Sequence, residues 1–267
     1  MLKPNYFFDL EELEAKPLFN GLDAVWDAIG QIKPFLQGNL VSSVAEIRKK
    51  GDLVKQTHVL WNGKIITEDL ELKPGDTTKG KFEVFHRGEK LEHAAVIYAG
   101  AALMDDDIQI GSGVVIESGA LIKGPAIIGD NTEVRQGAYL RGSTLVGRAC
   151  VVGHVTEMKN SIMLDGAKAG HFAYLGDSVL GREVNLGAGT KLANFKIARG
   201  PIKIKVEGEV IELNIRKLGA ILGDNTSTGC NTVTSPGTLM GPSSVVAPNM
   251  TVPAGYHRRR TVIRPKK

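Results

Sequence analysis

One histidine stands in a context that the other five in the sequence lack. His171 lies in the segment KAGHFAYLGD, residues 168–177, which interrupts an otherwise regular repeat. An imidazole titrates near neutral pH, so it can take up and release a proton under physiological conditions. Interruptions of a strict local pattern tend to mark functional sites, and we therefore expect proton transfer at His171. A structural role is the simpler explanation for the remaining histidines, which are His58, His86, His93, His154 and His257.

Neither a metal centre nor a covalent intermediate has support in the sequence. His154 and His171 are alone in their region, so no third imidazole completes a metal site. Cys150 and Cys230 lie eighty residues apart without CxxC spacing, and no histidine lies near Cys230 in the sequence. We predict no bound metal, no cysteine nucleophile and no disulfide framework, as suits a reducing cytoplasm.

The elements that position His171 are indicated by an aliphatic residue at every sixth position. This period fits neither a helix nor a simple strand, whose side chains recur every 3.6 and 2 residues. It is typical of short β units stacked on one another, with three hexads forming a coil of about 18 residues around an inward aliphatic ladder. We predict a parallel β-helix over residues 96–256. The inward positions of its first run are Ile110, Ile116, Ile122, Ile128, Val134, Leu140, Val146, Val152, Met158 and Leu164.

The repeat is interrupted twice. The hexads resume out of register at Leu180, sixteen residues after Leu164, and the interval encloses the segment of His171. Residues 195–217 then carry the runs IKIKV and EVIEL around Glu207-Gly208, which predicts a hairpin that leaves the β-helix. Hexads return from Leu222 to Val252.

We read residues 1–95 as a small α+β region and residues 257–267 as a basic tail. In the first region we predict a short helix that Asp9 caps, a second that stops before Pro34, and a third over residues 41–50. Asn62-Gly63 predicts a hairpin turn. The region has no Gly-rich phosphate loop after a strand, so we expect no nucleotide-binding half.

The composition is that of an ordinary soluble protein. Of the 267 residues, 42% are hydrophobic and 23% are charged, and the net charge of +4 is too mild to favour nucleic acid as a partner. Neither a signal peptide nor an 18-residue apolar run occurs, so we expect a cytoplasmic protein without membrane contact.

Three ordered motifs resemble a known enzyme family. They are HVTEMKNS at 154–161, KAGHFAYLGD at 168–177, and NLGAGT at 185–190 with Asn194. They are similar to the acetyltransferase half of bacterial N-acetylglucosamine-1-phosphate uridyltransferase. They are also similar to archaeal fusions of sugar-1-phosphate nucleotidyltransferase with amino-sugar-1-phosphate acetyltransferase, which share the Lys-rich hairpin insertion. The likeness covers residues 100–256. It implies a left-handed parallel β-helix, acetyl-CoA as co-substrate, and a homotrimer with active sites between neighbouring subunits.

The resemblance also implies roles for individual residues. His171 matches the general base that takes a proton from the sugar's amino group, and Glu157 could orient it. The positions that match sugar-phosphate contacts are Arg141, Lys159, Tyr174 and Asn185, with Lys203 of the insertion as a further phosphate contact. Asn194 matches a position near the acetyl group. Ala188 lies in a Gly-Ala-Gly turn whose amides could bind the coenzyme. Cys230 is the second predicted coenzyme-binding residue, and it stands where bacterial relatives tend to have Ser.

Simpler explanations compete with several of these roles. Arg141 and Lys159 could be solvated rim charges, and the asparagines could be residues of β-corners. The Arg run at 258–260 could meet the phosphates of coenzyme A or be a solvated terminus.

The implied function is acetyl-CoA-dependent N-acetylation of an amino-sugar 1-phosphate, with glucosamine 1-phosphate favoured. One alternative is acylation of another amino sugar, including a nucleotide-linked one. The other is an inactive homologue whose β-helix serves as a scaffold. We expect no nucleotidyl transfer, because the Gly-rich signature of that activity is missing from this sequence.

Overall fold

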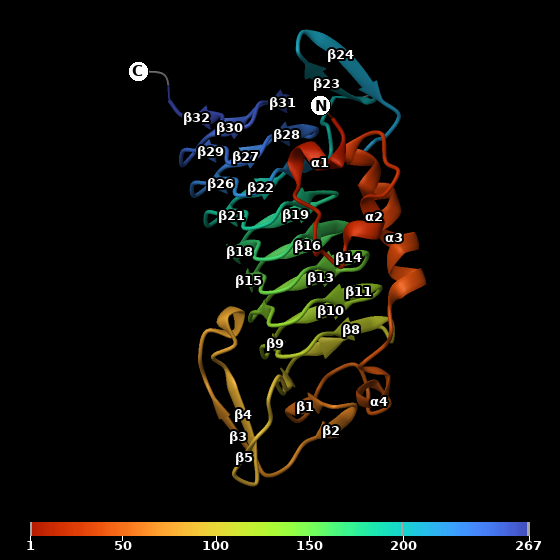
Figure 1. Cartoon of the computed structure of the whole chain (residues 1–267), viewed down its shortest axis with the longest axis vertical. Helices are drawn as coiled ribbons and strands as arrows, with labels where there is room; N and C mark the ends of the chain where they lie inside the picture. The colour runs from red at the N-terminus through yellow and green to blue at the C-terminus, as the bar shows by residue number, and fades with distance from the viewer. Residues whose placement is uncertain (1, 199, 266–267) are drawn as a thin grey trace.

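The computed structural model describes residues 2–198 and 200–265, and most of them form a parallel β-helix (Figure 1). Consecutive strands pass in turn to three sheets, which we call faces I, II and III. Face I consists of β6 (Ala95–Ile97), β9 (Val115–Ile116), β12 (Glu133–Val134), β15 (Val151–His154), β18 (Lys168–His171), β21 (Asn185–Leu186), β26 (Ser227–Thr228), β29 (Val245–Val246) and β32 (Val262–Ile263).

Faces II and III contain eight strands each. Face II consists of β7 (Ala102–Leu103), β10 (Leu121–Lys123), β13 (Tyr139–Arg141), β16 (Glu157–Lys159), β19 (Tyr174–Gly176), β22 (Lys191–Leu192), β27 (Val233–Thr234) and β30 (Thr251–Val252). Face III consists of β8 (Ile108–Ile110), β11 (Ala126–Ile128), β14 (Thr144–Val146), β17 (Ser161–Met163), β20 (Val179–Leu180), β25 (Ala220–Leu222), β28 (Thr238–Met240) and β31 (Gly255–His257). The predicted parallel β-helix is confirmed.

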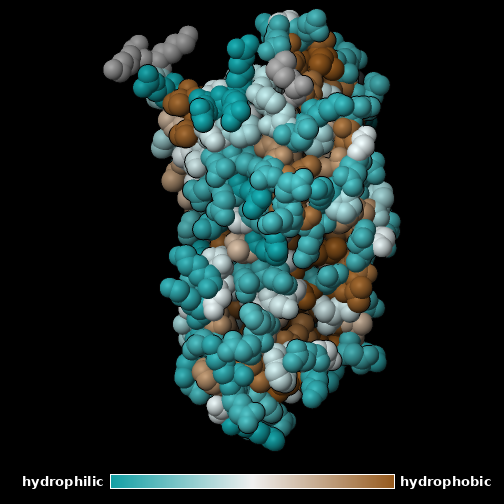
Figure 2. Space-filling view, in the orientation of Figure 1, coloured by the Kyte–Doolittle hydropathy of each residue, from teal (hydrophilic) through white to brown (hydrophobic). Residues whose placement is uncertain are grey.

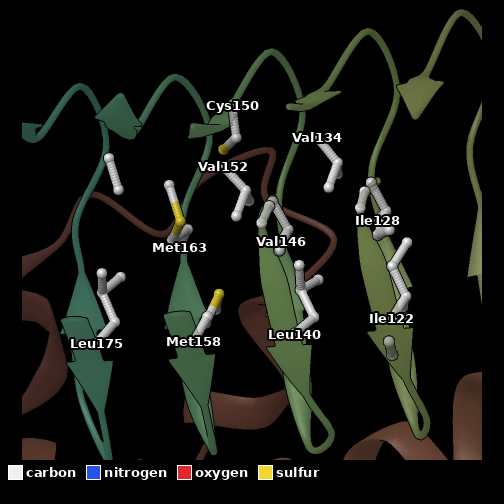
Figure 3. Close-up of a cluster of buried hydrophobic side chains, with 14 of the residues drawn as sticks. Ile122, Ile128, Val134, Leu140, Val146, Cys150, Val152, Met158, Met163 and Leu175 are labelled. Carbon is white, nitrogen blue, oxygen red and sulfur yellow. The ribbon is translucent and has the colours of Figure 1, made fainter. Parts of the chain in front are cut away.

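The predicted aliphatic ladder forms the core of the β-helix. Nine of its ten first positions, from Ile110 to Met158, belong to one buried cluster. Complete burial of such a side chain stabilises the fold by about 1.5–3 kcal/mol. The tenth position was wrong: Met163 points inward and not Leu164, as Figure 3 shows for Met163. Leu164 packs instead in a second buried cluster.

The register break has a simple geometric origin. Leu140 is opposite Met158, 18 residues along the chain, whereas Met158 is opposite Leu175, only 17 residues along. One residue is missing at each of two corners between faces II and III, where Asn160 and Asp177 turn the chain with φ of 46° and 47°. The sequence placed the slip between Leu164 and Leu180, but the structure divides it between these two shortened corners.

Residues 2–40 cover face III. Figure 1 shows α1 (Pro4–Phe7), α2 (Lys16–Phe19) and α3 (Ala28–Asn39) on one side of the β-helix, with the 3₁₀ turn Val25–Asp27 leading into α3. Ile32 and Leu36 of α3 share a buried cluster with the outward side chains of face III. Near the other end of the β-helix, the backbone amide of Asp9 donates to the Asp224 carboxylate at 2.7 Å. This segment is therefore a strap along the β-helix, not a unit at its start.

Two local predictions in this strap were wrong. The second predicted helix runs through Pro34 to Asn39, because burial of Leu36 against face III outweighs the hydrogen bond that proline removes. No helix follows Asp9 directly; its side chain accepts from the amide of Glu11 at 3.2 Å in a turn. The view in Figure 2 is largely hydrophilic, with apolar residues showing in patches along the side of this strap and also at the top of the molecule.

The remaining elements lie at the two ends of the β-helix. At the first end are α4 (Ala45–Arg48), the predicted hairpin of β1 (His58–Trp61) and β2 (Lys64–Ile66), the 3₁₀ turn Thr77–Lys79, and a small sheet of β3 (Leu70–Lys73), β4 (Glu83–His86) and β5 (Glu89–Lys90). At the other end the insertion forms the predicted hairpin of β23 (Ile202–Val206) and β24 (Glu209–Leu213). The region we read as a basic tail begins inside the β-helix, because β32 pairs with β29.

Among the described residues, no helix is both long enough and apolar enough to cross a membrane.

Two neighbouring valines of β29 test the inward ladder. Val246 points into the core with 1% of its surface exposed, whereas Val245 on the same strand is 45% exposed. Val246→Ala should lower the free energy of unfolding by about 2 kcal/mol because it leaves a cavity. The matched control Val245→Ala should change it by less than about 0.5 kcal/mol. Urea unfolding followed by circular dichroism measures both, and equal effects would contradict the assigned register.

Candidate active site

Four predicted site residues point outward from neighbouring strands of face II. Leu140, Met158 and Leu175 fill the core from β13, β16 and β19. Since side chains alternate along a strand, the residues on either side of each point away from the core. The outward residues are Arg141 on β13, Glu157 and Lys159 on β16, and Tyr174 on β19. The parallel register aligns Glu157 with Tyr174 and Lys159 with Gly176.

Arg141 is paired with a carboxylate on the next coil. Its guanidinium donates to Glu157 at 2.6 Å, and this bond raises the pKa of Arg141 above its usual value. The guanidinium carbon also lies 5.9 Å from the centre of the Tyr139 ring. Within the described residues, the side chain of Glu157 therefore contacts Arg141. The predicted orientation of His171 by Glu157 stays a prediction.

Asp177 is the centre of a buried polar network at the shortened corners. Its carboxylate, 4% exposed as a residue, accepts from the side-chain amides of Asn194 at 2.5 Å and Asn160 at 2.7 Å. The ammonium of Lys159 lies 3.8 Å from the same carboxylate. Because two amides hold it, Asp177 fixes the amide orientation of Asn194 and holds a negative charge beside Lys159.

Tyr174 extends this network toward the solvent. Its hydroxyl donates to the amide oxygen of Asn194 at 3.3 Å. Burial raises the pKa of Tyr174, and the charges of Glu157 and Asp177 raise it further. The phenol therefore stays protonated at neutral pH and remains a hydrogen-bond donor.

Gly176 allows Tyr174 and Asn194 to approach each other. A Cβ atom at Gly176 would lie 2.6 Å from both the Asn194 amide nitrogen and the Tyr174 hydroxyl. Any larger residue would push these two groups apart.

His171 lies where face I turns into face II, one corner away from the network. It is exposed at the end of β18, and its ring stacks on that of His154 in the preceding coil, with ring centres 6.2 Å apart. Two exposed apolar side chains, Val155 and Phe172, follow these histidines in the chain. The imidazole is thus accessible, with apolar surface beside it.

The two predicted coenzyme residues continue the same corner in the next coils. The amide of Gly189 donates to the carbonyl of His171 at 3.1 Å, and the amide of Asn231 donates to the carbonyl of Ala188 at 2.8 Å. His171, Ala188 and Cys230 therefore occupy successive coils of one corner. Cys230 is exposed, whereas Cys150 is buried and burial raises its thiol pKa to about 12.

Two predicted residues lie apart from this arrangement. Asn185 projects from face I, where it pairs with Lys168 and Ser227 and not with the residues of face II. Lys203 lies on the insertion hairpin and forms an ion pair with Glu212 at 2.9 Å. Their roles stay predictions.

The sequence interpretation missed Asp177 and Asn160. Both lie in the quoted motifs, but neither was assigned a role. The available signal was the position of Asp177, a carboxylate between the aliphatic residues Leu175 and Val179. A charge buried at such a position needs hydrogen-bond partners. Among the described residues, no group of His, Cys, Asp and Glu has the arrangement of a metal site.

Comparison with known proteins finds partial matches in sequence. Residues 122–227 match the family described as "GMPPB C-terminal domain". A bifunctional sugar-1-phosphate nucleotidylyltransferase/acetyltransferase of Sulfurisphaera tokodaii is 42% identical over 69 residues, which are 26% of this chain and 17% of the relative. The bifunctional protein GlmU of Methanocaldococcus jannaschii is 39% identical over 69 residues, again 26% of this chain and 17% of the relative.

The solved structures that match are more distant in sequence. Perosamine N-acetyltransferase from Caulobacter crescentus, in complex with CoA and GDP-perosamine, is 15% identical over 57% of this chain and 52% of its own, with a TM-score of 0.31. A UDP-N-acetylglucosamine acyltransferase is 13% identical over 59% of this chain and 68% of its own, with a TM-score of 0.22.

By fold and motifs the chain resembles a hexapeptide-repeat acetyltransferase. Its sequence is similar to part of the GlmU-type bifunctional proteins, and the aligned stretch spans less than a fifth of their length.

Proposed function

We propose that the protein is an N-acetyltransferase that transfers an acetyl group from acetyl-CoA to an amino sugar with a phosphate on its anomeric carbon. The observation that carries this proposal is the grouping on face II. Arg141, Lys159 and Tyr174 point outward side by side, and the corner that follows His171 leads onto the same face. Glucosamine 1-phosphate is the first acceptor to test.

His171 serves as the general base in this proposal. Bound acetyl-CoA supplies an acetyl group as a thioester. As the sugar nitrogen forms its bond to the acetyl carbon, His171 takes a proton from that nitrogen. The carbon–sulfur bond then breaks, and the imidazolium returns the proton to the leaving thiolate. His171 ends the cycle in its starting state.

The corner that carries His171 fits the acyl donor. A Cβ atom at Gly187 would lie 2.6 Å from the amide nitrogen of Cys230, so only a glycine allows the two coils to approach there. The turn at Ala188 and the exposed Cys230 present small side chains and backbone groups to an extended ligand. Backbone N–H groups of such a turn can stabilise the oxyanion that forms on the thioester carbonyl.

Face II fits the phosphate. Lys159 supplies an ammonium group, and Tyr174 supplies a protonated hydroxyl. Arg141 can exchange its exposed partner Glu157 for a phosphate oxygen, because an ion pair of this exposure contributes only about 0–1 kcal/mol. Asn194 is held by Asp177 close to Tyr174, where it can bind a sugar or acetyl oxygen.

A homotrimer would complete this site. His171 and the phosphate-binding cations lie toward opposite edges of face II, and Val155 and Phe172 leave apolar surface exposed beside the imidazole. A second copy packed on this corner would cover that surface and close the site. Light scattering at micromolar concentration should give three times the mass of the chain. A fully active monomer would contradict the shared site.

The role of His171 can be tested by its replacement. His171→Ala should lower kcat by about 10²–10⁴-fold, because the amine then loses its proton acceptor. Binding of coenzyme A should change little. The fold should persist, because the side chain is exposed. His154→Ala removes the neighbouring imidazole and should stay within a few-fold of wild-type activity. Wild-type turnover in an intact His171→Ala assembly would exclude His171 as the base.

The phosphate contact predicts a different kinetic signature. Lys159→Ala should raise KM for the amino-sugar phosphate more than it lowers kcat, because the contact exists in ground and transition states alike. Lys123→Ala is a suitable control, since Lys123 projects from the same edge of face II two coils away and contacts Tyr139. Steady-state thiol-release kinetics separate the two parameters. An unchanged KM in Lys159→Ala would mean that the phosphate binds elsewhere.

The scaffold alternative makes the opposite prediction. It expects no thiol release with any amino-sugar phosphate, so the same assay in the wild-type protein decides between an enzyme and an inactive homologue.

A further inference from the structure

A pocket of about 590 Å³ adjoins the phosphate-binding end of face II. Three parts of the chain surround it: the strap from Gly21 to Gln31, the shortened corners at Asn160 and Asp177, and the end of the insertion at Ile215 and Lys217. Its volume is within the usual range for small-molecule pockets, which is about 300–1,000 Å³. None of the predicted site residues lines it.

The pocket is continuous with the polar network described above. Asn160 follows Lys159 directly in the chain, and Asp177 lies 3.8 Å from the Lys159 ammonium. Since Asp177 also lines the pocket, the wall of the pocket begins at the carboxylate beside the phosphate-binding ammonium. A group attached to the far side of a phosphate at Lys159 would therefore enter this pocket.

The lining has the chemistry that recognises a nucleoside. The indole of Trp26 lines the pocket and is only partly buried, and an aromatic face open to a pocket can stack on a base. Asp23 and Asp27 line the same pocket as exposed carboxylates. Carboxylates can accept hydrogen bonds from ribose hydroxyls and from base N–H groups.

The same lining includes one cation. Lys217 is exposed at the pocket and can pair with the second phosphate of a nucleoside diphosphate, which the carboxylates alone would repel. The nucleotide part of coenzyme A is disfavoured by position, because Ala188 and Cys230 lie at the opposite edge of face II.

We propose that this pocket is a nucleoside subsite, so that the enzyme also accepts nucleoside-diphosphate amino sugars. The inference rests on the proposed function, and it identifies the class of acceptor. In this arrangement the phosphate nearest the sugar binds at Lys159 and Arg141. The second phosphate meets the ammonium of Lys217, and the nucleoside stacks on Trp26. The strap thereby acquires a role in acceptor selection as well as in covering face III.

The test compares two acceptors in pocket variants. Acetyl transfer is measured with glucosamine 1-phosphate and with UDP- and GDP-linked amino sugars. Trp26→Ala should lower kcat/KM for the preferred nucleotide-linked acceptor by about 5- to 150-fold, the loss expected for one stacked base. Glucosamine 1-phosphate should be used within about threefold of wild type. Trp26→Phe should restore most of the loss, since it keeps an aromatic face.

Two further variants keep the test decisive if Trp26→Ala folds poorly. Asp27→Asn changes an exposed carboxylate without loss of volume and should weaken only the nucleotide-linked acceptor. Trp61→Ala changes the other tryptophan, on β1 at the first end of the β-helix, and should affect neither acceptor. Equal effects of the Trp26 and Asp27 substitutions on both acceptors would overturn the subsite.

A binding measurement separates this proposal from the proposed function. Trp61→Phe leaves Trp26 as the single tryptophan, so its fluorescence reports on the pocket. Saturable quenching by UMP or GMP, lost in Asp27→Asn, would support the subsite even if no acceptor is acetylated. Acetylation of glucosamine 1-phosphate, without quenching and without use of any nucleotide-linked acceptor, would overturn the subsite and leave the proposed function standing.

Discussion

The stacking register of the β-helix determines where every site residue lies. Inward aliphatic side chains from Ile110 onward fill a dry core, and each coil must place them over those of the coil before. Outward side chains are then aligned as a consequence, so that Glu157 and Tyr174 become neighbours although seventeen residues separate them. A slip of one residue in one strand would turn its outward residues into the core. The arrangement of side chains on the outside of face II therefore depends on how the inward side chains stack in the core.

The two shortened corners show how this constraint can be used. Removal of one residue between faces II and III tightens the turn at Asn160 and again at Asp177. Both turns adopt positive φ, which Asn and Asp tolerate better than most residues. Their side chains then meet at 2.7 Å, and the amide of Asn194 joins them from the next coil. The shortened corners that make the repeat irregular thus also bring the buried Asp177 carboxylate and its amide partners together.

The sequence revealed the fold more completely than the site. Hexads are a local signal with one physical explanation, so the core from Ile110 to Met158 could be predicted residue by residue. Leu164 was assigned to the core because the loss of one residue at Asn160 leaves no mark in the sequence at that point. It becomes visible only when later aliphatic positions fall out of register. The strap could not be placed at all, because its apolar face fits any apolar surface. Asp177 was missed because its importance arises from partners seventeen residues away on either side.

Arg141 and Lys159 differ in how firmly the carboxylates beside them are fixed. Glu157 and Arg141 are both partly exposed, and the described residues give Glu157 no second anchor, so this pair can open at little cost. Asp177 is buried and fixed by two amides, and moving it would leave polar groups without partners inside the protein. The carboxylate beside Lys159 thus stays in place whether or not an anion is bound, whereas the pair of Arg141 and Glu157 can open toward one. A phosphate arriving at face II would meet one cation beside a fixed carboxylate and one cation whose partner can move.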